Sequence, residues 1–129
     1  MKSILVSPGL PAVPVEISVD EIRSLLGCVS FAYPYDDPIC LAHDDDGIAN
    51  RRLPNRTING QIMPGPFYVL GFSDSGELMD LSPELEAKYL SLFSIPEDFP
   101  SGCWKVTTRT KETKHAAIIS IESAWEVSQ

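Results

Sequence analysis

Residues 47–72 read GIANRRLPNRTINGQIMPGPFYVLGF, and the rest of the chain can be interpreted around them. The end of this stretch, Phe67–Phe72, is the most strand-like apolar segment, and its two apolar faces predict a central strand. The part before it, Arg51–Gly65, is rich in Pro, Asn and Gly and predicts a long irregular loop, a feature that is more often functional than not. We therefore expect polar function in the loop that precedes the central strand.

Length and composition indicate a small soluble protein. The chain has 129 residues, 43% of them hydrophobic, which suffices for one domain that buries roughly two-thirds of its unfolded surface. No apolar run approaches the ~18 residues of a membrane span, and the apolar N-terminal stretch is too short for a signal peptide. Three cysteines without a CxxC pair argue against a disulfide framework. These features favour the cytosol.

The charge of the chain restricts its partners. A net charge of -8 disfavours general binding to nucleic acid, because phosphate contacts need clustered Lys and Arg. An acidic surface favours solubility, steering toward basic proteins, or mimicry of nucleic acid.

Alternating apolar residues predict four strands before the central one, at residues 3–7, 12–17, 28–33 and 39–43. Pro14 lacks a backbone N–H and therefore places the second strand at an edge of the sheet. Ser18-Val-Asp-Glu21 has the capping-box pattern that begins a helix, and Gly27 is its expected end. Asp44-Asp-Asp-Gly47 predicts a hairpin turn, because such a turn needs positive φ.

A second helix follows the central strand, with Ser82 as its cap and Pro83 at its first position. Its expected buried stripe consists of Leu85, Tyr89, Leu92 and Phe93. The pattern as a whole predicts an α+β fold in a single domain, with a mostly antiparallel sheet and two helices.

The C-terminal part predicts a β-hairpin over residues 105–110 and 117–121. Trp104 and Trp125 are expected to anchor it on the core or on a partner. Its basic residues form either the solvent face of an edge hairpin or a second element that contacts an anion; they are Lys105, Arg109, Lys111 and Lys114. We expect residues 1–98 to form the core and residues 99–129 to form a hairpin extension packed on the same domain.

The arginine cluster before the central strand has two interpretations. Guanidinium forks match phosphate or carboxylate, so Arg51, Arg52 and Arg56 can bind an anion together with Asn55. Alternatively, Asn55 fixes a turn and the arginines pair with carboxylates that are near in sequence. Those carboxylates are Asp36, Asp37, Asp44, Asp45 and Asp46.

The sequence contains little that indicates a metal site or a catalytic site. If Gly47 were the sixth residue of an EF-hand loop, the first and twelfth residues would be Ala42 and Leu53. Neither can supply the carboxylate that calcium needs there. Cys40 and His43 are three apart on a strand and therefore point to opposite faces, which disfavours zinc. The chain has neither a nucleophile elbow nor a P-loop. We expect no catalytic residue, no metal and no cofactor, although an enzyme without a local motif stays an open alternative.

The order of several motifs resembles that of a protein family from bacteriophages and bacterial mobile elements. This family is catalogued as domain of unknown function 3846. The resemblance covers about residues 2–93, and its most specific part is Leu53-Pro54-Asn55-Arg56 after Asp46-Gly47. The other matching features are Val15-Glu16-Ile17, the helix that ends in Gly27, an aromatic-rich strand before an acidic turn, the Gly65 to Gly71 strand, and Leu81-Ser82-Pro83-Glu84.

This resemblance implies no enzymatic activity and a mobile-element setting, in which small acidic proteins that blunt host defence are common. We therefore expect a non-enzymatic inhibitor in the bacterial cytoplasm. Its partner would be a host protein such as a nucleic-acid-targeting nuclease, in the manner of an anti-CRISPR or antirestriction protein. The expected contact residues are Asp36, Asp37, Asp44, Asp45 and Asp46.

The alternative is a protein that binds or sequesters a small anionic, nucleotide-like ligand. That ligand would contact Arg51, Arg52, Asn55 and Arg56 and stack on an aromatic such as Tyr68 or Tyr33. Direct contact with nucleic acid or membrane is not expected in either case, and the oligomeric state stays open.

Overall fold

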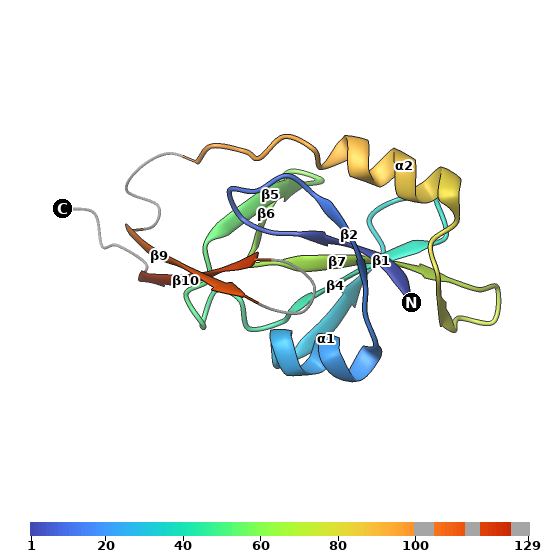
Figure 1. Ribbon diagram of the computed structural model, residues 1–129, viewed down its shortest axis with the longest axis horizontal. Coiled ribbons are helices and arrows are strands. Elements are labelled where there is room, and N and C mark those ends of the chain that lie inside the picture. The colour runs from blue at the N-terminus through green and yellow to red at the C-terminus, as the bar shows by residue number, and fades with distance from the viewer. Residues whose placement is uncertain (100–104, 113–116, 125–129) are drawn as a thin grey trace.

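The computed structural model describes residues 1–99 in full and, beyond them, the main chain of residues 105–112 and 117–124 (Figure 1). Its elements in chain order are β1 (Lys2–Val6), β2 (Val13–Glu16), α1 (Val19–Leu26), β3 (Val29–Ala32), β4 (Ile39–Asp44), β5 (Pro54–Ile58), β6 (Gln61–Pro64), β7 (Phe67–Phe72), β8 (Leu78–Met79), α2 (Pro83–Leu92), β9 (Lys105–Glu112) and β10 (Ala117–Ala124).

The centre of the fold is a six-stranded sheet with the order β2-β1-β7-β4-β3, in which β8 also pairs with β7. Every strand pair in it is antiparallel. Val69 of β7 lies between Ile4 of β1 and Leu41 of β4, so the predicted central strand is confirmed. The edge position predicted for the strand with Pro14 is confirmed as well, because β2 ends the sheet. The α+β class with a mostly antiparallel sheet and two helices is therefore confirmed.

Both faces of the sheet are buried, because alternate residues of each central strand belong to different clusters. Ile4, Leu41 and Val69 pack with Tyr89 and Phe93 of the α2 region, on what we call the α2 face. Their strand neighbours on the opposite, α1 face pack with Ile22 and Leu26 of α1; they are Leu5, Cys40, Ala42, Tyr68 and Leu70. The two helices lie on opposite sides of the sheet (Figure 1).

The helix α1 begins and ends where the sequence predicts. Ser18 Oγ accepts a hydrogen bond from the Glu21 N–H at 3.2 Å, and Glu21 Oε1 accepts one from the Ser18 N–H at 3.2 Å. Gly27 ends the helix with φ of 82°, a conformation that glycine adopts without steric cost. Because α1 connects β2 to β3, it carries the chain from one edge of the sheet to the other. This crossing makes β3 the far edge strand.

The helix α2 also begins as predicted, since Ser82 Oγ accepts a hydrogen bond from the Leu85 N–H at 3.3 Å. Its inner side is aromatic, with the Phe93 ring 5.3 Å from that of Phe67 in an edge-on arrangement. The predicted buried stripe is wrong at Leu92, which is 53% exposed. The prediction is confirmed at Tyr89 and Phe93, which are 1% and 4% exposed.

Two predictions before the central strand are wrong. The segment that we expected to be an irregular loop contains the antiparallel hairpin β5–β6. Its turn is Asn59-Gly60, with φ of 50° and 81°, the left-handed pair that a two-residue type I′ turn requires. The expected hairpin turn at Asp44-Asp-Asp-Gly47 is a turn, with the Gly47 N–H donating to the Asp44 carbonyl at 3.1 Å. It leads away from the sheet, because β4 pairs with β3 and β7 and not with the strand that follows the turn.

The strands β9 and β10 pair with each other in a separate two-stranded antiparallel sheet, from Lys105 opposite Ala124 to Glu112 opposite Ala117. The predictions for Trp104, Lys114 and Trp125 fall outside the described residues. Whether this extension packs on the core stays a prediction. Across the described residues, the structure has no helix that is both long and apolar enough to cross a membrane.

Candidate functional site

The Leu53-Pro54-Asn55-Arg56 motif directs its polar side chains into the protein. Arg56 is 2% exposed, and its Nη2 donates to the carbonyls of Leu10 at 2.7 Å and Phe93 at 3.0 Å. Its Nη1 donates to Asn55 Oδ1 at 2.8 Å. Burial lowers the pKa of the Arg56 guanidinium, and the charge of Glu97 opposes this shift. The cation is thus stabilised mainly by the dipoles of carbonyl groups. Because these carbonyls belong to distant segments, Arg56 links those segments to one another.

Asn55 serves the same purpose beside Arg56. It is fully buried, and its Nδ2 donates to the carbonyls of Val6 and Gly65, each at 2.8 Å. Together, Asn55 and Arg56 connect the end of β1, the β1–β2 turn, the end of α2 and the end of β6. The motif therefore holds the β5–β6 hairpin on the α2 side of the sheet.

Arg52 follows the second interpretation of the arginine cluster, pairing with a nearby carboxylate. Its Nε lies 2.7 Å from Asp44 Oδ2, and the Asp44 side chain has no exposed surface. Asn50 Nδ2 at 2.8 Å and the Asp46 N–H at 2.9 Å also donate to this carboxylate. Burial alone would raise the pKa of Asp44, but the hydrogen bonds from Asn50, Arg52 and Asp46 outweigh it and hold that pKa below its ordinary value. The pair fixes the turn between β4 and β5.

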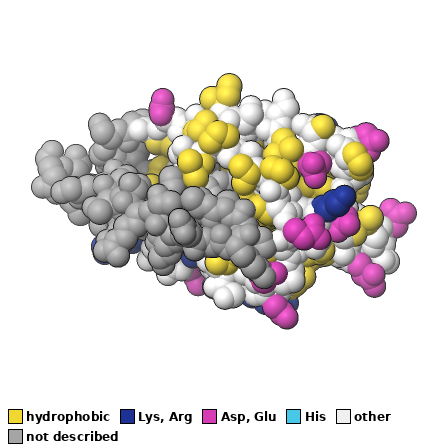
Figure 2. All heavy atoms as spheres, in the orientation of Figure 1, with side chains coloured by type: hydrophobic (Ala, Val, Ile, Leu, Met, Phe, Trp, Pro, Cys, Tyr) yellow, Lys and Arg dark blue, Asp and Glu magenta, His cyan; other side chains and the backbone are white. Residues whose placement is uncertain are grey.

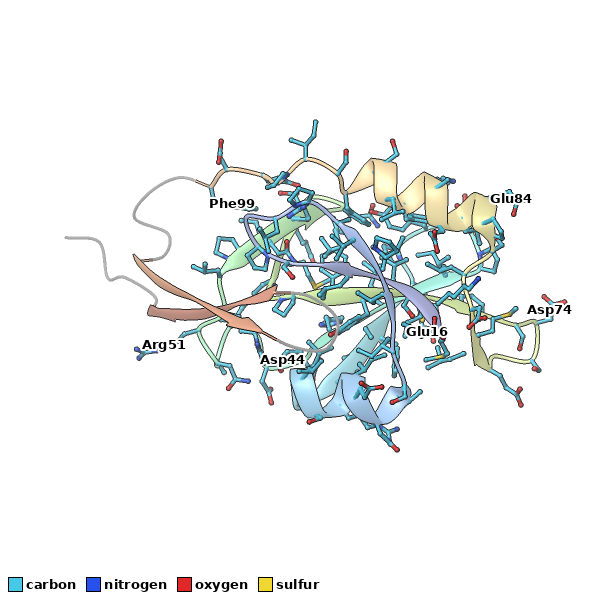
Figure 3. All side chains as sticks on the ribbon, viewed as in Figure 1. Glu16, Asp44, Arg51, Asp74, Glu84 and Phe99 are labelled. Carbon is cyan, nitrogen blue, oxygen red and sulfur yellow. The ribbon has the colours of Figure 1, made fainter. Side chains whose placement is uncertain are left out.

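The predicted ligand residues do not converge on one site. Tyr68 is fully buried on the α1 face, whereas Arg56 reaches Phe93 on the α2 face. Burial first, and then the charge of Glu21, raise the pKa of the Tyr68 hydroxyl, which has no hydrogen-bond partner among the described residues. Among the predicted arginine and asparagine ligands, Arg51 alone is classed as exposed, and it extends outward from the turn (Figure 3). Of the two predicted aromatics, Tyr33 is 63% exposed. An anion from solvent can therefore reach Arg51, and in part Arg52, but not Asn55, Arg56 or Tyr68 in their present positions.

The predicted partner-binding carboxylates fall into two groups at opposite ends of β4. Asp36 is exposed, while Asp37 accepts hydrogen bonds from Lys88 Nζ and from Tyr89 Oη, the latter at 2.8 Å. These bonds, from Lys88 foremost, hold the pKa of Asp37 below its ordinary value. Asp45 and Asp46 are exposed at the other end of the strand, roughly 20 Å away for a strand of this length. The acids therefore form two separate surfaces.

A groove of about 640 Å³ lies between the turn that follows β4 and the β5–β6 hairpin. We call it the acidic groove, because Asp45 and Asp46 stand beside an apolar lining. Asn59 Nδ2 donates to the Pro34 carbonyl at 3.1 Å and ties the hairpin tip to the segment after β3. The remaining residues that line the groove are Ala32, Pro34, His43, Asp44, Gly47, Ile48, Ala49, Ile58, Asn59, Gln61, Ile62, Met63 and Pro64.

Cys28 lies beside this groove without the properties of a nucleophile. It is exposed, and the carboxylate of Asp46, assisted by partial burial and by Asp45, raises the pKa of its thiol. Nucleophilic cysteines need the opposite shift, which cationic neighbours provide. Cys40 and His43 lie on opposite faces of β4, as predicted, with Cys40 in the α1-face cluster and His43 at the groove.

The sequence profile of one family, a domain of unknown function (DUF3846), matches residues 1–94. The chain belongs to this family. The DUF3846 region contains the complete six-stranded sheet, both helices and the β5–β6 hairpin, whereas β9 and β10 lie beyond it. No curated protein and no solved structure matches the chain. Within this DUF3846 member, the motif that carried the resemblance has a structural place, because Asn55 and Arg56 are buried.

The groove of this DUF3846 chain was not predicted from its sequence. Its lining comes from three segments that are separate in the sequence: the end of β3, the turn after β4 and the β5–β6 hairpin. One signal was present, since Asn59-Gly60 stands between Ile58 and Ile62 as a hairpin turn between alternating strands. Recognising that hairpin would have predicted an element beside the turn at Asp45 and Asp46.

Proposed function

We propose that this protein acts by binding another protein, without catalysis, and that the acidic groove is its contact surface. The observation that carries this proposal is the combination of an apolar lining with exposed carboxylates at its margin. Apolar side chains in a groove supply the contacts that dominate binding energy, while charges at the margin select and steer the partner. Ile48 at 62% and Ile62 at 41% are the most exposed large apolar side chains of the lining.

The charge of the core favours a basic partner. Residues 1–99 contain fifteen Asp or Glu and six Lys or Arg. Arg52 and Lys88 pair with Asp44 and Asp37, and Arg56 is buried. The core therefore presents few unpaired basic side chains to a partner, whereas most of its carboxylates stay exposed. In the view of Figure 2, acidic side chains predominate over basic ones on the described surface. Such a field accelerates the encounter with a basic surface and weakens with added salt.

The internal use of the perturbed ionisable groups supports binding over catalysis. Active sites commonly hold groups with shifted pKa values in an accessible cleft. Here three of the shifted groups, Asp37, Asp44 and Arg56, form structural hydrogen bonds. Asp44 belongs to the groove lining, but its side chain has no exposed surface. The shifted Tyr68 hydroxyl is buried away from the groove. The Cys28 thiol, which is exposed, is shifted toward its unreactive protonated form.

The setting implied by the family resemblance suggests the partner class. In a phage or mobile element, a small acidic protein gains most by covering the nucleic-acid-binding surface of a host defence nuclease in the bacterial cytoplasm. Such a surface is basic, because it must bind phosphates. The acidic groove has the complementary sign. Inhibition of a nucleic-acid-targeting nuclease is accordingly the role that we propose.

Charge reversal at the groove tests this proposal. The full chain and the double variant Asp45→Lys, Asp46→Lys would be purified from host cells, and their complexes compared by native mass spectrometry. The matched control is Asp74→Lys with Glu84→Lys, which makes the same charge change at exposed residues on the end of the molecule away from Arg51 (Figure 3).

We expect the groove variant to lose the protein partner and the control to keep it, and the remaining complex to weaken as salt increases. Equal loss in both variants would show a general charge effect and overturn the groove as the contact surface, and an unaffected groove variant would do the same. A nucleotide-sized mass on the protein, lost in Arg51→Ala, would instead support the small-ligand alternative.

A further inference from the structure

We propose that the partner contributes an extended segment that pairs with the outer edge of β3 and places alternate side chains in the acidic groove. This inference rests on the proposed protein-binding function and specifies its mode. The segment has no proline where it meets β3 and carries Lys or Arg at the end that lies beside Asp45 and Asp46.

The sheet has two edges, and only one suits an added strand. At the β2 edge, Pro14 has no N–H to donate. At the other edge, β3 runs from Val29 to Ala32 without proline. An edge strand with unpaired main-chain groups is a template for another chain. β3 is therefore the edge that can accept a partner.

The register identifies the main-chain groups that face outward. The Asp45 N–H donates to the Cys28 carbonyl at 2.7 Å, and the pairing continues with Ser30 opposite His43. In antiparallel pairs, every second residue directs its N–H and C=O toward the neighbouring strand. Cys28, Ser30 and Ala32 thus face β4, which leaves the N–H and C=O groups of Val29 and Phe31 directed outward. Within residues 1–99, these groups have no hydrogen-bond partner.

Both sides of this edge offer places for side chains. On the α2 side, Ala32 and His43 belong to the acidic groove. On the α1 side, Phe31 is 37% exposed and Tyr33 is 63% exposed, and the Tyr33 ring stands edge-on against Phe72 at 5.4 Å. Because side chains of a strand alternate between faces, one set enters the groove and the next lies against these aromatic rings.

Repulsion between carboxylates disfavours a second copy of this chain as the strand that pairs with β3. Two copies of β3 paired antiparallel would bring the Asp45–Asp46 end of one near Asp36 of the other, and like charges opposite one another are destabilising. A segment with Lys or Arg at its end meets Asp45 and Asp46 with the complementary sign. A basic partner segment is thus the occupant that the described residues favour.

The first experiment uses a matched pair of variants in the full chain. Phe31→Pro removes an outward N–H without removing a hydrogen bond to β4, whereas Phe31→Ala removes the same ring and keeps the N–H. The probe is a synthetic peptide of alternating Val and Thr with Lys at both ends. We expect Phe31→Pro to bind it at least tenfold more weakly than Phe31→Ala, with circular dichroism confirming that both variants fold. Equal affinities, or no binding to the wild type at millimolar peptide, would overturn the inference.

The second experiment does not depend on a variant that folds. The same peptide with N-methyl groups on the amides that face β3 should lose binding, and methylation of the other amides should not. Peptide binding should also slow hydrogen exchange at the Val29 and Phe31 amides. Slow exchange in the free monomer would show that the chain's own β9–β10 covers the edge, and slow exchange that depends on protein concentration would show a second copy. Either result overturns the inference.

The experiments distinguish a failure of strand addition at β3 from a failure of the acidic groove as the contact surface. If β3 pairing fails while charge reversal at Asp45 and Asp46 still removes the cellular partner, the groove binds its partner without strand addition. If charge reversal has no effect, the proposed function fails first.

Discussion

At the scale of single residues, Arg56 shows how a charged side chain can serve as a structural tie. Its guanidinium joins Leu10 and Phe93, which are 46 and 37 residues away in sequence. Planar forks with several donors suit such multi-acceptor sites, and a lysine ammonium does not reproduce their geometry. Without this group, the buried Asn55 Oδ1 and the partly buried Leu10 carbonyl would lose their donor, which is costly in a protein interior. The Phe93 carbonyl would keep a hydrogen bond from the Ala12 N–H.

We therefore expect Arg56→Met to lower the free energy of unfolding by about 3 kcal/mol, since two buried or partly buried acceptors lose their donor. Urea denaturation of the full chain measures this change. The control is Arg23→Met on the exposed surface of α1, for which a change within about 0.5 kcal/mol is expected. A loss of similar size in both variants would contradict the structural role of Arg56. Arg56→Lys should remain destabilised, since one ammonium cannot replace the fork.

At the scale of elements, the β5–β6 hairpin depends on glycines at two different kinds of position. Gly60 has φ of 81° and open space where an added Cβ would lie, whereas a Cβ on Gly65, at φ of 78°, would lie 2.4 Å from Arg52 Cδ. Left-handed backbone alone costs roughly 1–2 kcal/mol in a residue with a side chain. The environment of Gly65 adds a steric conflict with the arginine that holds Asp44.

Gly60→Ala should accordingly lower the free energy of unfolding by about 1 kcal/mol, and Gly65→Ala by clearly more, because Arg52 must also move. Thermal or urea denaturation of both variants tests the order. If Gly60→Ala were the more damaging change, the contact between Gly65 and Arg52 would not be the constraint that we describe.

The same hairpin shows why part of the fold and most of the site escaped prediction. Helix starts at Ser18 and Ser82 and the edge strand at Pro14 could be predicted, because caps and proline act locally. Pro54 and Pro64 at the hairpin ends obscured the Asn59-Gly60 turn. The burial of Arg56 could not be predicted, because most of its acceptors are main-chain oxygens of distant segments, and main-chain oxygens are the same at every residue type. The groove likewise depends on tertiary placement of separate segments.

At the scale of the whole molecule, stability should depend on acidity through two carboxylates. Asp37 and Asp44 both have pKa values held below the ordinary 3.8. A group with a depressed folded-state pKa stabilises the fold above its unfolded pKa, and this stabilisation is lost as pH falls through the folded value. The free energy of unfolding should therefore be constant near neutrality and decrease below about pH 4.

Urea denaturation between about pH 7 and about pH 2.5 tests this dependence. Asp44→Asn should be less stable than the wild type at neutral pH, and the difference should shrink in acid, where the wild-type carboxylate becomes protonated. Asp74→Asn, at an exposed turn, should follow the wild-type curve. Parallel curves for the wild type and Asp44→Asn would contradict a stabilising role for the ionised Asp44.

The central place of β7 also has a consequence for the order of events during synthesis. β1–β2 and β3–β4 are each local hairpins, but neither meets the other, because β7 lies between β1 and β4. At about 5–20 residues per second, a ribosome completes β7 several seconds after β2. During this interval the apolar faces of both hairpins lack their common neighbour. The sheet can form only after β7 has emerged, and its α2 face is covered only when Tyr89 and Phe93 follow. Chaperone contact should therefore begin to fall once Phe72 has left the exit tunnel and end only after Phe93 has done so.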